Sequence, residues 1–64
     1  MIYAPVLYAE DLRLVTDAFA SEMERGQAKR AALNYATAVY LQRHPFVAVG
    51  EARAMIRAAI GDFT

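Results

Sequence analysis

Three stretches of the chain repeat apolar residues with the period of an α-helix. In the first stretch these residues recur at spacings of three, four and four, at Leu12, Val15, Phe19 and Met23. Glu10 and Asp11 stand in the first turn, where the helix dipole favours acids. Gly26 is typical of the left-handed residue that ends a helix. The pattern predicts a helix over residues 9–25, with Leu14 on its otherwise polar face.

The second stretch, residues 27–44, contains neither proline nor glycine, so its helix propensity is high. Its apolar residues fill one broad arc of a helical wheel: Ala28, Ala32, Leu33, Tyr35, Ala36, Val39 and Tyr40. The opposite arc holds the polar positions: Gln27, Arg30, Asn34, Thr37, Leu41 and His44. Pro45 lacks an amide hydrogen and disfavours helical backbone in the residue before it. We therefore expect this helix over residues 27–44.

The third stretch has the most regular pattern, which predicts a helix over residues 49–62. One face carries the residues expected to be buried: Ala52, Met55, Ile56, Ala59, Ile60 and Phe63. The opposite face is nearly flat and consists of Arg53, Ala54, Arg57, Ala58 and Gly61. Its small side chains would let another helix approach closely.

Residues 1–8 carry no charge and include Pro5, and we expect them to form an extended apolar arm along the helices. With 64 residues the chain can build only one core. The sequence therefore predicts a single all-α domain, a compact three-helix bundle with an N-terminal arm.

Composition suggests that this core is thin. Hydrophobic residues make up 58% of the chain, above the roughly 45–50% of ordinary domains, but 14 of them are alanines, which bury little area. There is no cysteine and one histidine, so the sequence offers neither a disulfide nor a metal site, and we expect no cofactor. Association with another chain is then the remaining source of stabilisation for so small a domain.

The charges cancel overall but not locally. Residues 10–25 hold five acids against two arginines, whereas residues 27–43 hold three basic residues and no acid. We expect these helices to pair side by side, and the alternative is that one of the two faces meets a partner of opposite charge. No apolar run is long enough to cross a bilayer and the start does not resemble a signal peptide, so we expect a cytoplasmic protein.

Candidate catalytic groups are few. His44 stands at the end of the second helix, where a histidine commonly caps carbonyls, and Ser21 lies mid-helix without an activating turn. The neighbouring acids Glu10 and Asp11 point to different sides of a helix and are expected to be solvated. The three glycines are too far apart to form a phosphate-binding loop. The sequence therefore does not indicate an enzyme.

Several residues are expected on the surface although they are apolar or small, and we predict that they bind a partner. They are Tyr3, Tyr8, Leu14, Leu41, Arg53, Ala54, Arg57 and Ala58. The function that follows is a protein–protein interaction module, either a homodimer or a small adaptor or inhibitor that docks on a larger protein. The plainer alternative is that the arm covers the thin core of its own chain.

A second hypothesis is a small DNA-binding regulator. The break at His44 and Pro45 has the length of a helix-turn-helix turn, and Arg53 and Arg57 could contact phosphates from the third helix. No Asn, Gln or Ser beside these arginines is placed to read bases, and the net charge is zero. Protein binding is therefore the favoured interpretation.

Overall fold

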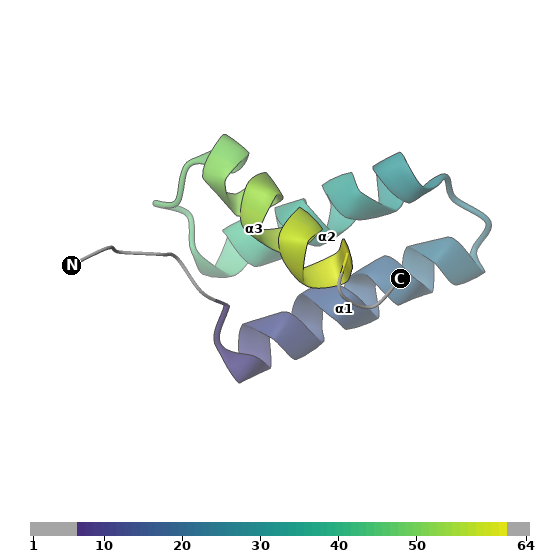
Figure 1. Ribbon diagram of the computed structural model, residues 1–64, viewed down its shortest axis with the longest axis horizontal. Coiled ribbons are helices and arrows are strands. Elements are labelled where there is room, and N and C mark those ends of the chain that lie inside the picture. Colours follow the sequence, from purple (N-terminus) through teal and green to yellow (C-terminus); the bar gives the residue numbers. More distant parts are fainter. Residues whose placement is uncertain (1–6, 62–64) are drawn as a thin grey trace.

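The computed structural model describes residues 7–61 and shows three α-helices: α1 (Ala9–Glu24), α2 (Lys29–Arg43) and α3 (Val49–Gly61). α1 and α2 lie side by side in opposite directions, and α3 folds back across them, with more contact to α2 than to α1 (Figure 1). Residues 7–61 contain no strand. The predicted compact three-helix, all-α fold is thus confirmed.

The turn between α1 and α2 is set by Gly26, whose φ of +85° is the left-handed conformation predicted for it. The Gly26 amide donates to the carbonyl of Met23 at 3.0 Å, and the Gln27 amide donates to that of Glu22 at 3.1 Å. These two bonds form a Schellman motif, which satisfies carbonyls at the end of the helix. Because Gln27 belongs to this cap, α2 begins at Lys29 after an extended Ala28 and not at residue 27 as expected.

The connection between α2 and α3 is a tight turn. α2 ends at Arg43, one residue earlier than expected, and His44 has left the helical conformation before Pro45. The Val47 amide donates to the His44 carbonyl at 3.1 Å and closes the turn. Pro45 and Phe46 are the two central residues, and proline is favoured at the first of these positions. α3 starts at Val49, as predicted.

The core consists mainly of small side chains. The fully buried apolar residues are Val15, Ala32, Ala36, Ala52 and Ile56, and the nearly buried ones are Phe19, Tyr40 and Ile60. Among the fully buried residues in the described part of the chain, only Val15 and Ile56 are large. Leu7 packs against this core from the chain that precedes α1. The rest of the predicted arm, and Asp62 and Phe63 at the other end, lie outside the described residues.

Several side chains depart from the helical-wheel expectation. Thr37 was expected on the polar face but is buried, because its hydroxyl donates to the Leu33 carbonyl at 2.8 Å and so needs no water. Tyr35 and Met23 were expected to be buried, yet they are 47% and 42% exposed. None of the helices within residues 7–61 has the length and apolar character needed to cross a membrane.

The two glycines Gly26 and Gly50 provide a matched test of the turn. No atom lies within 4 Å of a Cβ added at either position, so steric clashes do not contribute. Gly26→Ala should lower the free energy of unfolding by about 1 kcal/mol because of its positive φ. Gly50→Ala, inside α3, should raise it by about 0.5–1 kcal/mol. Urea unfolding measures both, and effects of the same sign would contradict this account of the turn.

Candidate protein-binding surface

The start of α1 and the turn between α2 and α3 lie at the same end of the bundle (Figure 1). Large apolar side chains in these two segments are exposed. Phe46 is 100% exposed, Tyr8 is 77% exposed and Val49 is 59% exposed. We call these three residues the turn-end surface. Aromatic side chains are enriched in protein interfaces because they bury a large apolar area. This surface is therefore the strongest candidate site among residues 7–61.

The exposure of Phe46 follows from the turn that carries it. The bond between Val47 and His44 places Phe46 at the third of four turn positions, at the tip. Val47 turns inward and packs against the core. The sequence His44-Pro45-Phe46-Val47 contained this signal, since a proline after the helix end favours such a turn. Sequence reasoning named Tyr8 but missed Phe46 and Val49.

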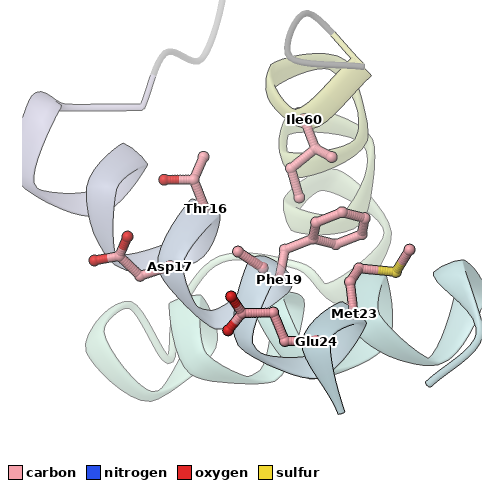
Figure 2. A pocket seen from close by; sticks show the side chains of 7 residues that line it. Thr16, Asp17, Phe19, Met23, Glu24 and Ile60 are labelled. Atoms are coloured by element: carbon pink, nitrogen blue, oxygen red, sulfur yellow. The ribbon is translucent and has the colours of Figure 1, made fainter. Parts of the chain in front are cut away.

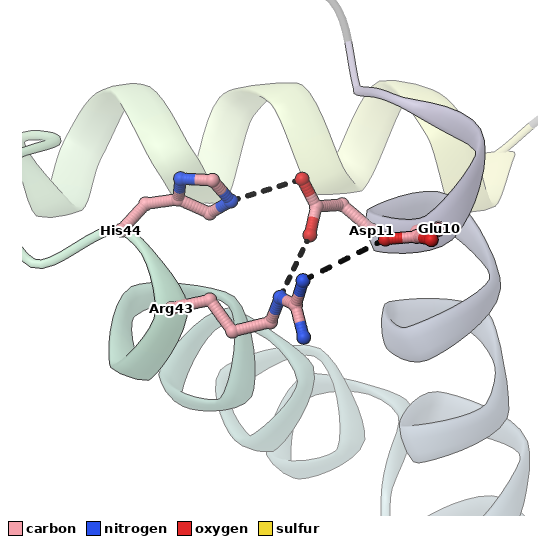
Figure 3. Close-up of polar contacts among 4 residues, drawn as sticks. All are labelled: Glu10, Asp11, Arg43 and His44. Carbon is pink, nitrogen blue, oxygen red and sulfur yellow. Dashed lines mark hydrogen bonds and ion pairs between the residues drawn. The ribbon is translucent and has the colours of Figure 1, made fainter.

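A buried carboxylate fixes this end of the bundle. Asp11, only 5% exposed, accepts a hydrogen bond from Arg43 Nε at 3.1 Å on one oxygen and lies 2.9 Å from His44 Nε2 on the other (Figure 3). Glu10 Oε2 lies 3.9 Å from Arg43 Nη2. We call Asp11, Arg43 and His44 the ionic clasp. It joins the first turn of α1 to the residues that lead into the turn at Phe46.

The structure of the ionic clasp shows that two expectations from the sequence, for His44 and for Asp11, are wrong. The His44 side chain pairs with a carboxylate 33 residues away instead of capping the carbonyls of α2, and its ring stacks on Tyr40 with centroids 4.6 Å apart. Asp11 is buried instead of solvated, while the neighbouring Glu10 remains exposed. Opposite charge and hydrogen bonding compensate the desolvation of a buried carboxylate, which explains how Asp11 occupies this place.

The predicted small-residue face of α3 is exposed, with Arg53, Ala54, Arg57 and Ala58 all at the surface. The Arg53 guanidinium donates to Asn34 Oδ1 of α2 at 2.7 Å, so one of the two arginines is engaged within the chain. The other predicted partner-binding residues lie elsewhere. Leu14 is half-buried on α1, Leu41 is half-buried on α2 and packs against the core, and Tyr3 is outside the described residues.

A groove lies between α1 and the end of α3. It is an open groove with a volume of about 540 Å³, and its apolar lining comes from Phe19, Ala20, Met23 and Ile60. Thr16, Asp17 and Glu24 complete it. Figure 2 shows the Phe19 ring directed toward Ile60 with Met23 beside it, and the carboxylates of Asp17 and Glu24 at the edge. The groove is thus an apolar depression whose charged lining residues are both acidic.

In the described part of the chain, no three His, Asp or Glu side chains gather as metal ligands. Comparison with known proteins gives no match: no family model fits the sequence, and no curated protein or solved structure is significantly similar. The class that the fold defines is a small all-α three-helix domain.

The ionic clasp can be tested with two neighbouring acids. Asp11→Ala leaves Arg43 and His44 without their shared partner and should destabilise the fold by about 1–3 kcal/mol. Each kcal/mol lowers the melting temperature of a domain this small by about 4–8 °C. Glu10→Ala, at an exposed side chain in the same helical turn, should change stability by less than about 0.5 kcal/mol. Equal effects in thermal unfolding would show that Asp11 acts only through the helix dipole.

Proposed function

We propose that this chain is a non-enzymatic protein–protein interaction module that forms a homodimer or docks as a small adaptor or inhibitor on a larger protein. The complete exposure of Phe46 on a closed turn carries the proposal. Removing one phenyl side chain from water stabilises a complex by about 1.5–3 kcal/mol. A partner that covers Phe46, Tyr8 and Val49 together would remove more apolar area from water and form a more stable complex.

Rigidity supports the same function. Phe46 sits between Val47, which packs on the core, and His44, whose ring is held by Asp11 and Tyr40. A turn whose flanking residues are anchored before binding loses less conformational freedom when the complex forms. The thin, alanine-rich core adds a second reason, because a small domain gains stability when a partner binds its folded state.

Removing the Phe46 ring from the turn-end surface is expected to remove binding of the partner. Phe46→Ser should abolish self-association or capture of the partner, measured by sedimentation of the pure protein and by affinity capture with the tagged chain. The melting temperature should stay unchanged, since the ring contacts no core residue when fully exposed. Tyr35→Ser, which removes an exposed aromatic side chain from α2, is the matched control and should bind as wild type. A wild-type chain that stays monomeric and captures nothing would refute the proposal.

The DNA-binding alternative predicts that the chain binds a DNA duplex and that this binding depends on salt. Contacts to phosphates release counterions, so affinity for a DNA duplex would fall steeply as salt rises. With Arg53 engaged by Asn34 and a net charge of zero, we expect no binding to a duplex even at low salt. A fluorescence titration at two salt concentrations checks this. Salt-dependent binding that Arg57→Ala weakens would support the alternative instead.

A further inference from the structure

The turn-end surface is built from two segments that are far apart in the sequence. Tyr8 directly precedes α1, and its carbonyl accepts a hydrogen bond from the Leu12 amide at 2.8 Å, so its backbone belongs to the first turn of that helix. Phe46 lies in the turn that follows α2, and Val49 is the first residue of α3. A partner that covers all three exposed side chains therefore needs the two segments in one arrangement.

The ionic clasp is a polar contact between these two segments. Asp11 stands three residues after Tyr8, within one helical turn, and His44 stands two residues before Phe46. Among residues 8–14, Asp11 is the only buried one. A buried carboxylate thus anchors the part of α1 that carries one half of the turn-end surface.

Both oxygens of the Asp11 carboxylate take part. Oδ1 accepts a hydrogen bond from Arg43 Nε at 3.1 Å, and Oδ2 lies 2.9 Å from His44 Nε2 (Figure 3). Two contacts to consecutive residues restrict the direction of the chain as it leaves α2 more than one contact would. The His44 carbonyl also accepts the Val47 amide at 3.1 Å, so the residue that meets Asp11 closes the turn that carries Phe46.

We propose that Asp11 is the positioning residue of the turn-end surface and holds Phe46 in place relative to Tyr8 before a partner binds. The inference rests on the proposed function and adds to it a residue that acts from inside the chain. Asp11 is 5% exposed and offers a partner little area, so it acts through Arg43 and His44. Segments that are already held in their bound arrangement lose less freedom when the complex forms, which raises affinity.

Backbone relaxation of the nitrogen-15-labelled chain tests this inference without a partner. In wild type the Phe46 amide should have an order parameter near about 0.85, the value of rigid backbone. Asp11→Asn keeps the shape of the side chain but removes its charge and one acceptor oxygen. This variant should lower the order parameter of Phe46 toward about 0.6, while Gln27, in the turn at the other end of α2, should keep its value. His44→Gln alters only one of the two contacts and provides a second, milder variant.

Two control variants separate positioning from a general loss of stability. Glu10→Gln makes the same acid-to-amide change at an exposed side chain of the same helical turn. Arg53→Ala removes a polar contact between helices, the hydrogen bond to Asn34, away from the clasp. Both should leave the order parameter of Phe46 unchanged. A wild-type value in Asp11→Asn and His44→Gln, or an equal decrease in Arg53→Ala, would overturn the inference.

The association that Phe46→Ser abolishes supplies the second measurement, made with the pure chain or with the purified protein that the tagged chain captures. Asp11→Asn should raise the dissociation constant at least about tenfold at a temperature where both chains are folded, whereas Arg53→Ala should not change it. Wild-type affinity in Asp11→Asn would overturn the inference and leave the proposed function standing. A wild-type chain without any association would refute the proposed function, and the relaxation of Phe46 would still decide whether Asp11 positions the turn.

Discussion

The close approach of three helices through alanine is the constraint on which the structure depends. Ala32, Ala36 and Ala52 are fully buried where the helices meet. Methyl side chains allow the helices to come near each other, but each removes little apolar area from water. The domain therefore has few large side chains in its core, and several of its aromatic and aliphatic residues remain outside, with Phe46 at the extreme.

Polar contacts between the helices help to fix their relative positions, because the core has few large apolar side chains. The ionic clasp ties the start of α1 to the end of α2, and the bond from Arg53 to Asn34 ties α3 to α2. Hydrogen bonds to charged groups add geometric specificity to the apolar contacts. The turn that carries Phe46 follows directly after Arg43 and His44, so the contacts of these two residues with Asp11 help to set its direction.

The turn-end surface and the groove both lie on elements that pack against the core. The turn-end surface lies at one end of α3 and the acidic groove at the other, and both are built on elements that the core and the clasp hold in place. The exposed aromatic area at Phe46, on a turn held between the core and the ionic clasp, supports the proposed protein binding. These are local properties of named residues.

The sequence by itself determined the three helices, the left-handed Gly26 and the end of α2 before Pro45, because these depend on periodicity and on backbone restrictions that act within a few residues. It also indicated a thin core through its alanines. Only the tertiary structure decided that Asp11 is buried and Glu10 exposed, that His44 meets Asp11, and that a groove lies beside Ile60. These features require residues more than 30 positions apart to come together, and no local pattern specifies which side chains then meet.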